Sequence, residues 1–225
     1  MEEINKLNHQ TPLILLGCQV RHIALKRLFD ILFSSAVLVI GAPIFMLIGL
    51  LTWVASPGKI IYSHERIGRG GKPFRCYKFR SMYANADQLL DELLEKYPAL
   101  KAEWERSHKL KSDPRVTPFG AFLRKSSLDE LPQFWNVLKG DLSIVGPRPV
   151  SKEEVRKHYG AKAAKILSIR PGLTGLWQVS GRSDVGCYSK RVELDEAYVD
   201  SRSLLLDLKL IAKTIPAMLF SKGAY

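Results

Sequence analysis

Two adjacent carboxylates, Asp129 and Glu130, stand in a stretch that could perform chemistry on phosphate, RKSSLDELPQFWNVLKGD at positions 124–141. An ionised carboxylate can attack phosphorus, or it can ligate a magnesium ion that neutralises a diphosphate. A helix N-terminus would hold the carboxylate ionised and would bind phosphate through free backbone N–H groups. The structural alternative is that Ser127 to Glu130 forms the capping box S-x-x-E. For this tetrapeptide alone the cap is the commoner role, and both interpretations remain open.

Basic side chains at further positions could bind phosphate oxygens. Lys78 and Arg80 alternate with aromatic residues on a predicted strand, so their side chains should point to one face. Arg148 stands in a stiff Gly-Pro-Arg-Pro turn, and Arg170 and Arg182 also adjoin glycine or proline. Each residue taken singly is more often a solvated charge. Together, beside an apolar segment, they indicate a substrate with an anionic headgroup.

The overall composition is strongly basic. The chain has 225 residues, a net charge of +12 and a pI of about 9.7, which indicates one domain with a polyanionic partner. Charge alone does not choose among nucleic acid, anionic lipid and a phosphorylated substrate. The histidines and cysteines are too scattered to indicate a zinc site or a disulfide framework. The cysteines are Cys18, Cys76 and Cys187.

A long apolar segment precedes this chemistry, because positions 31–58 contain no charged residue. A straight helix of that length would reach about 42 Å and could cross a bilayer. Gly41 and Pro43 interrupt it, however, and each half is then too short to cross alone. Basic residues flank both ends, which favours a helix–break–helix that enters and leaves by the cytoplasmic face. The alternative is one kinked transmembrane helix. The flanking residues are Arg21, Lys26, Arg27, Lys59, Arg66, Arg69 and Lys72.

The rest of the chain is predicted to be mainly helical, with one small β-hairpin at 60–82. Its glycines, at 68, 70 and 71, suit a turn better than a nucleotide loop. Residues 86–108 read as a polar helical excursion with a break near Pro98. Residues 140–182 are rich in glycine and proline and should form loops. Residues 203–220 predict either an interfacial helix lying on the membrane or a buried core helix.

Taken together, these blocks resemble the bacterial sugar transferase family, the monotopic phosphoglycosyl transferases that prime polysaccharide synthesis. The resemblance runs from Lys26 to the C-terminus. Its blocks are KRLFD (26–30), the proline-broken apolar segment, YKFRSM (77–82), DPRVTPFGAFLRKSSLDELPQFWNVLKGDLSIVGPRP (113–149) and RPGLTGLWQVSGR (170–182).

The resemblance implies a monotopic membrane fold on the cytoplasmic face of the bacterial inner membrane. It divides the chain into an N-terminal tail (1–20), a re-entrant helix–break–helix (21–58) and a catalytic domain with an interfacial C-terminal helix (59–225). The family often has Ser-Pro at the break, where this chain has Ala42-Pro43, so no serine hydroxyl can bond the freed backbone there. The family often has Asn after Gly181-Arg182, where this chain has Ser183-Asp184.

The resemblance also implies a two-step reaction. Asp129 would attack the sugar-bearing phosphate of a UDP-sugar and expel UMP, and undecaprenyl phosphate would then attack the phosphosugar-enzyme. Glu130 would assist with protons or metal, and Mg²⁺ would be the cofactor, with Asp129 as its ligand. Galactose-1-phosphate is favoured over glucose-1-phosphate. The implied substrate contacts are Lys78, Arg80, Pro147, Arg148, Gln178 and Arg182.

The implied partners are the UDP-sugar, undecaprenyl phosphate and membrane lipid, with no nucleic acid, and a homodimer is left open. Two other classes compete with a transferase. One is a membrane-anchored protein that binds anionic lipid or nucleic acid, and the other is a scaffold for polysaccharide assembly without turnover. Neither explains the order of motifs around Asp129.

Overall fold

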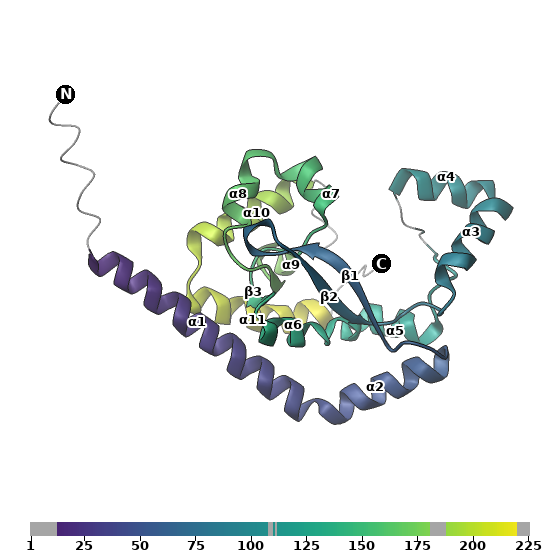
Figure 1. Ribbon diagram of the computed structural model, residues 1–225, viewed down its shortest axis with the longest axis horizontal. Coiled ribbons are helices and arrows are strands. Elements are labelled where there is room, and N and C mark those ends of the chain that lie inside the picture. Colours follow the sequence, from purple (N-terminus) through teal and green to yellow (C-terminus); the bar gives the residue numbers. More distant parts are fainter. Residues whose placement is uncertain (1–12, 108–109, 111, 181–187, 220–225) are drawn as a thin grey trace.

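The computed structural model describes residues 13–107, 110, 112–180 and 188–219, and it is mainly helical, as predicted. Helices α1 (Leu13–Ile40) and α2 (Ala42–Ala55) form a wide V along one side, and the other elements lie above it (Figure 1). Because α1 begins at Leu13, helix extends into the segment predicted as a tail.

The V is bent by 62° between the two helices, which confirms the predicted break. Gly41 is required there because a Cβ at this position would meet the Val37 carbonyl oxygen at 2.5 Å. Pro43 occupies the first turn of α2, where its missing N–H costs nothing. Among the described residues no single helix is long and apolar enough to cross a membrane, whereas the bent pair passes that test together. The re-entrant placement in a bilayer stays a prediction.

The predicted β-hairpin is confirmed. Strands β1 (Ile61–Ile67) and β2 (Pro73–Phe79) pair antiparallel, joined by a 3-10 turn, η2 (Arg69–Gly71). Gly70 and Gly71 have φ values of 69° and 74°, which explains the glycines as turn residues. The hairpin lies above the inner side of the V (Figure 1).

A second, parallel sheet was not predicted. Strands β3 (Ser143–Val145) and β4 (Gly172–Thr174) have only three residues each, too few for a periodic signal. A Cβ on Gly172 would overlap the backbone nitrogen of Gly146, so the two glycines let the strands' loops approach closely. The main core surrounds this sheet and includes Val137, Leu142, Ile144, Val145, Tyr198 and Leu210.

Helices cover the sheets or extend from them. Helices α3 (Ala86–Lys96) and α4 (Pro98–Ser107) project from the body, which confirms the predicted excursion and its break at Pro98 (Figure 1). The remaining elements are α5 (Pro118–Ser126), η3 (Leu128–Glu130), α6 (Gln133–Lys139), α7 (Lys152–Glu154), η4 (Val155–Tyr159), η5 (Gly160–Lys162), α8 (Ala163–Ile166), α9 (Leu176–Val179), α10 (Tyr188–Ser201) and α11 (Leu204–Leu219).

Helix α11 corresponds to the helix predicted at 203–220. One of its faces belongs to the core, where Leu210 is buried, and another exposes Leu205 and Leu208. It therefore combines features of both alternatives, since it packs as a core helix and also presents an apolar strip. Its contact with a membrane stays a prediction.

The KRLFD block ties α1 to the body through buried polar contacts. The Nζ of Lys26 lies 2.7 Å from Oδ2 of Asp207 on α11. Asp207 is only 1 % exposed. The hydroxyl of Tyr198 donates to the other oxygen of that carboxylate at 2.7 Å. Because each charged group has a partner, burial of the carboxylate is tolerated.

The same block also holds the elements that carry the candidate site. The guanidinium of Arg27 donates to the carbonyls of Val137 and Leu138 at 2.6 and 2.8 Å, which satisfies the last turn of α6. The carboxylate of Asp30 accepts from the Ser143 hydroxyl at 2.8 Å, at the start of β3. Helix α1 is thereby registered against α6 and β3.

Candidate active site

The acidic pair lies in η3, a single 3-10 turn between α5 and α6. The capping box predicted for Ser127 to Glu130 is wrong. Ser127 ends α5 in a left-handed conformation, with φ 56° and ψ 17°, and its side chain caps neither helix. An N-cap residue needs an extended backbone, which this conformation excludes. The next helix, α6, begins only after Pro132.

Lys78 joins both carboxylates of the pair. Its Nζ lies 2.6 Å from Oε1 of Glu130 and 3.9 Å from Oδ2 of Asp129. The three side chains differ in exposure: Asp129 is 11 % exposed, Lys78 26 % and Glu130 42 %. The hairpin therefore brings one predicted basic residue directly to the predicted acidic residues.

The environment of Asp129 differs from the one predicted. Burial, helped by the neighbouring carboxylate of Glu130, raises the pKa of Asp129 to about 6, although Lys78 and Arg124 pull it down. The sequence predicted a helix N-terminus that holds this carboxylate ionised, but the 3-10 turn supplies no such helix. At pH 7 the ionised form still prevails, and it lies in a poorly hydrated place beside two cations.

Arg80 lies one residue beyond β2, and its side chain does not join Lys78 at the acidic pair, although the sequence predicted that both would point to one face. Its guanidinium donates to the carbonyl of Ser56 at the end of α2, and its Nη1 lies 2.8 Å from where a Cβ of Gly58 would be. Gly58 has a φ of 132°, so glycine suits it on both counts. In this structure Arg80 fastens the end of α2 to the hairpin. Its role as a substrate contact stays a prediction.

The Gly-Pro-Arg-Pro loop places Arg148 on the same side of the hairpin as Lys78. Pro147 is buried, and its carbonyl accepts from the Gly172 amide at 2.7 Å, whereas Arg148 is exposed. The pKa of His64 falls to about 4, chiefly through burial and also through nearby cations, with Arg148 and Lys78 among them. The charges of both basic residues therefore act on the same histidine of β1.

Gln178 and Arg170 are at least partly buried in the structure. Gln178 is buried in α9, with its Oε1 close to the place where a Cβ of Gly175 would be, at 2.9 Å. The Nε of Arg170 donates to the Gly140 carbonyl at 2.8 Å, a structural contact. Arg182 lies outside the described residues.

Two arginines near the site, Arg124 and Arg66, were not among the predicted substrate contacts. Arg124 donates through Nε to the Ser81 hydroxyl at 2.8 Å, and its charge lowers the pKa of Asp129. Arg66 pairs with Glu154 at 3.0 Å. Arg66 could have been predicted from the alternation of His64 and Arg66 along β1, because residues two apart on a strand share a face.

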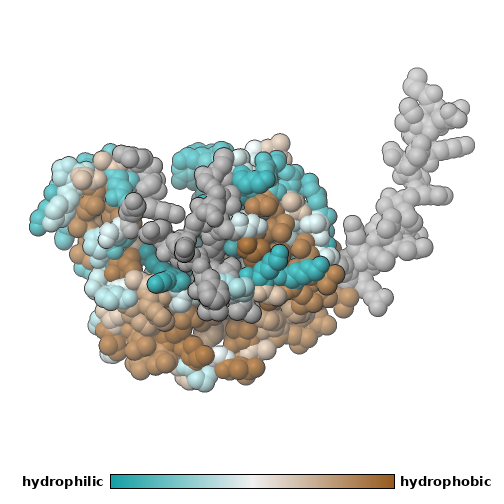
Figure 2. All heavy atoms as spheres, turned by 180° about the vertical axis from the view of Figure 1, so that it is seen from behind, coloured by the Kyte–Doolittle hydropathy of each residue, from teal (hydrophilic) through white to brown (hydrophobic). Residues whose placement is uncertain are grey.

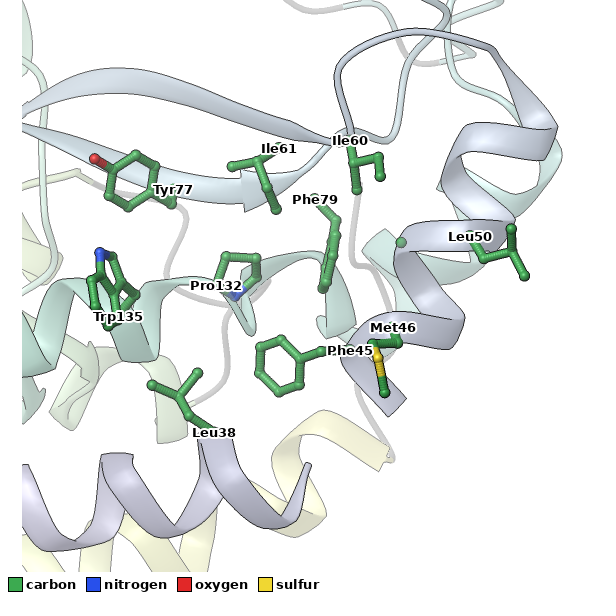
Figure 3. Close-up of a pocket in the computed structure, with 11 residues that line it drawn as sticks. Leu38, Phe45, Met46, Leu50, Ile60, Ile61, Tyr77, Phe79, Pro132 and Trp135 are labelled. Carbon is green, nitrogen blue, oxygen red and sulfur yellow. The ribbon is translucent and has the colours of Figure 1, made fainter. Parts of the chain in front are cut away.

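An apolar groove of about 700 Å³ adjoins the acidic pair. It lies between the V and the hairpin, and Pro132, three residues beyond Asp129, forms part of its wall (Figure 3). Figure 3 shows Phe45 and Met46 entering from α2 and Trp135 from α6. Its lining is Leu38, Phe45, Met46, Gly49, Leu50, Ile60, Ile61, Tyr77, Phe79, Pro132 and Trp135.

Comparisons with known proteins agree with one another. A family model described as "Bacterial sugar transferase" matches residues 21–221. The exopolysaccharide production protein ExoY of Sinorhizobium fredii is 48 % identical over 200 residues, which cover 89 % of this chain and 88 % of that protein. The undecaprenyl-phosphate galactose phosphotransferase of Salmonella typhimurium is 48 % identical over 201 residues, covering 89 % of this chain and 42 % of that protein. The UDP-glucose:undecaprenyl-phosphate glucose-1-phosphate transferase of Klebsiella pneumoniae is 37 % identical over 208 residues, covering 89 % and 41 %.

Proposed function

The chain belongs to the bacterial sugar transferase family, and from that premise we propose that it transfers a sugar-1-phosphate from a UDP-sugar to undecaprenyl phosphate, releasing UMP. The observation that carries the proposal is the position of the acidic pair. Asp129 and Glu130 both lie within 4 Å of the Lys78 cation, and an apolar groove is lined by Tyr77 and Phe79 on either side of Lys78 and by Pro132, three residues beyond Asp129. Such a place suits a substrate with a phosphate head and a hydrocarbon tail.

In the first step the carboxylate of Asp129 attacks the β-phosphorus of the UDP-sugar. A bond forms between the carboxylate oxygen and phosphorus, and the bond from phosphorus to the bridging oxygen breaks, so that UMP leaves with that oxygen. In the second step an oxygen of the lipid phosphate attacks the same phosphorus and frees the carboxylate. Low hydration around Asp129 favours this sequence, because it keeps water from hydrolysing the intermediate.

Cations beside the pair would stabilise the charge that moves between phosphates. Lys78 is close enough to contact a phosphate held at Asp129, and Arg148 adds a second charge on the same side of the hairpin. In this structure Pro147 holds its loop through Gly172 and Arg80 holds the end of α2 through Ser56, and direct contacts of Pro147, Arg80 and Gln178 with the substrate are part of the proposal.

Magnesium fits the donor set in a limited way. Among the described residues no three His, Cys, Asp or Glu side chains gather into a group that could hold a metal ion. Mg²⁺ commonly binds through one or two carboxylates together with substrate phosphates, which Asp129 and Glu130 would provide. When bound, the ion would neutralise charge on the diphosphate.

The apolar surface supports the proposal that the protein is monotopic, with this surface embedded in the cytoplasmic leaflet of the membrane. Figure 2 shows hydrophobic residues gathered along the lower side of the molecule, the side on which the V lies in Figure 1. An apolar patch this large is unusual on a protein surrounded by water. Its exposed members include Leu32, Val39, Ile40, Met46, Val54 and Phe122. The groove opens beside this surface and would receive the isoprenoid chain of the acceptor.

The burst of UMP formed without lipid acceptor should depend on pH with a midpoint near 6. Only the ionised carboxylate of Asp129 attacks, and burial has raised its pKa from 3.8 to about 6, so the burst rate falls as the pH drops through that value. Rapid-quench measurements between pH 4.5 and 8 test this. Lys78→Gln should move the midpoint upward, because Lys78 lowers this pKa. A midpoint near 4 would contradict the assignment.

Filling the groove should weaken binding of the lipid acceptor without affecting the reaction with the UDP-sugar. Gly49→Leu places a side chain in the groove, where a Cβ meets Ile60 at an ordinary 3.5 Å. We expect the KM for undecaprenyl phosphate to rise about tenfold, the equivalent of roughly two buried methylene groups. The UMP burst should stay unchanged. Leu47→Phe is the control, because Leu47 is exposed on α2 and does not line the groove. An equal rise in both variants would argue against the groove as the acceptor site.

Galactose is the proposed sugar, because the relative named for galactose is more similar to this chain than the one named for glucose. The test is UMP release by the purified protein with undecaprenyl phosphate and Mg²⁺, with UDP-galactose and UDP-glucose in parallel. UMP from UDP-galactose supports the proposal, and UMP from UDP-glucose alone reassigns the sugar. No UMP from a broad panel of UDP-sugars would favour the scaffold or the lipid-binding protein.

A further inference from the structure

Two arginines lie within cation–π distance of the indole of Trp177. The guanidinium carbon of Arg148 is 5.0 Å from the ring centre, and that of Arg191, on α10, is 4.9 Å away. Both distances suit cation–π attraction, which is strongest for tryptophan. Trp177 itself is only 4 % exposed, so the ring is a fixed platform, whereas Arg148 is exposed.

The polar end of this indole is not used by the described part of the chain. The Nε1 of Trp177 is buried, and no hydrogen-bond partner for it is found there. An unpaired buried donor is costly, and phenylalanine would fill much of the same space without that cost. The face of the ring, and not its N–H, is therefore the feature with a use at this position.

The backbone of Arg148 is fixed as well. Its amide donates to Oδ1 of Asp195, a residue 2 % exposed on α10, in a long hydrogen bond of 3.4 Å. The Tyr159 hydroxyl donates to the other oxygen of that carboxylate at 3.5 Å. Arg148 is thus held at its amide by Asp195 and at its guanidinium by Trp177.

We propose that Trp177 is a positioning residue that holds the guanidinium of Arg148 in place for the diphosphate of the nucleotide sugar. A free arginine side chain loses much rotamer freedom when it binds phosphate. Stacking on the indole removes that freedom before the substrate arrives, so binding costs less. The inference rests on the proposed function, because it takes a UDP-sugar as the ligand.

The first test compares two substitutions in the Asp129→Asn background, where binding is read without turnover. UDP-galactose binding, followed by calorimetry, should weaken about threefold in Trp177→Phe and about tenfold or more in Trp177→Leu, because phenylalanine keeps a weaker cation–π contact. The melting temperature of Trp177→Phe should not fall in step with affinity, since an unpaired donor is removed. Trp104→Phe is the matched control. Trp104 lies on α4, away from the site, and the guanidinium carbon of Arg115 is 5.0 Å from its ring centre. This variant should bind UDP-galactose as tightly as the parent protein.

A double-mutant cycle identifies the residue through which Trp177 acts. Arg148→Ala together with Trp177→Leu should bind no more weakly than Arg148→Ala alone. Additive losses, or a cycle that couples Trp177 to Arg191 instead, would overturn the proposal, as would unchanged binding in both Trp177 variants. Binding of UDP-galactose by the parent protein without UMP release by the wild type would instead count against the proposed function.

Discussion

Asp129→Asn is expected to abolish UMP release, with a loss of at least about 1000-fold, while the protein stays folded. An amide oxygen is a poor nucleophile, so neither step of the exchange can proceed through it. The fold should tolerate the change, because the pKa of about 6 means that the site already accommodates a neutral side chain at modest cost. The measurement is UMP formation from UDP-galactose, alongside a thermal melt in detergent.

Covalent labelling separates a nucleophile from a merely important charge. Wild-type protein incubated with UDP-galactose labelled in the sugar, without lipid, should retain the label through denaturing electrophoresis, and Asp129→Asn should retain none. Glu130→Gln is the matched control, because it removes the adjacent carboxylate that Lys78 contacts at 2.6 Å. It should still become labelled, although more slowly. Label in Asp129→Asn would show that another residue forms the intermediate.

Lys26→Ala is expected to lower the free energy of unfolding by about 3 kcal/mol, the lower end for breaking a buried ion pair. The substitution leaves the carboxylate of Asp207 buried at 1 % exposure without its cation, and the Tyr198 hydroxyl cannot neutralise it. Activity at low temperature should survive where folding does, because Lys26 pairs with carboxylates on α1 and α11 that are not part of the proposed site. Thermal unfolding in detergent micelles, followed by circular dichroism, measures the effect.

The control removes both charges together. Lys26→Met with Asp207→Asn removes both charges of the 2.7 Å pair, and the amide at position 207 can still accept from Tyr198. The carboxylate of Asp30, 4.0 Å from the Lys26 Nζ, keeps its hydrogen bonds from the Ser143 hydroxyl and the Ile144 amide. The double variant should recover most of the free energy of unfolding that Lys26→Ala loses, since replacing both members of a buried ion pair is often tolerated. If the double variant were as unstable as Lys26→Ala, the contacts of the Lys26 stem, and not its charge, would explain the effect.

The elements that depend on neighbours in sequence could be predicted. Gly41 and Pro43 determine the break in the apolar helix, because Pro43 has no N–H to donate to the preceding turn and the bent backbone leaves no room for a Cβ at position 41. The hairpin followed from two β-prone runs around Gly70 and Gly71, whose left-handed backbone few other residues adopt. The family, and with it the acidic pair, followed from the order of the motifs.

The capping box failed because local pattern was used where tertiary contacts decide. The S-x-x-E pattern at Ser127 is the same one that forms a true capping box at Ser151 and Glu154. At Ser127 the backbone instead turns left-handed to bring Asp129 beneath the hairpin. Ser151 follows a loop that contains Pro149, whereas Ser127 directly follows the last residue of α5, so the two serines start from different backbones.

The sequence by itself thus determined the family, the broken apolar helix, the hairpin and the candidate nucleophile. Only the tertiary structure decided which basic residue meets the acidic pair. Lys78 reaches Glu130 across 52 positions, while Arg80, two residues on, turns to the end of α2, because β2 ends between them. The pKa of Asp129 and the groove likewise arise from burial between distant elements, and Lys26 finds Asp207 across 181 positions. Burial and pairing at such separations depend on the packing of the whole chain, which no local pattern encodes.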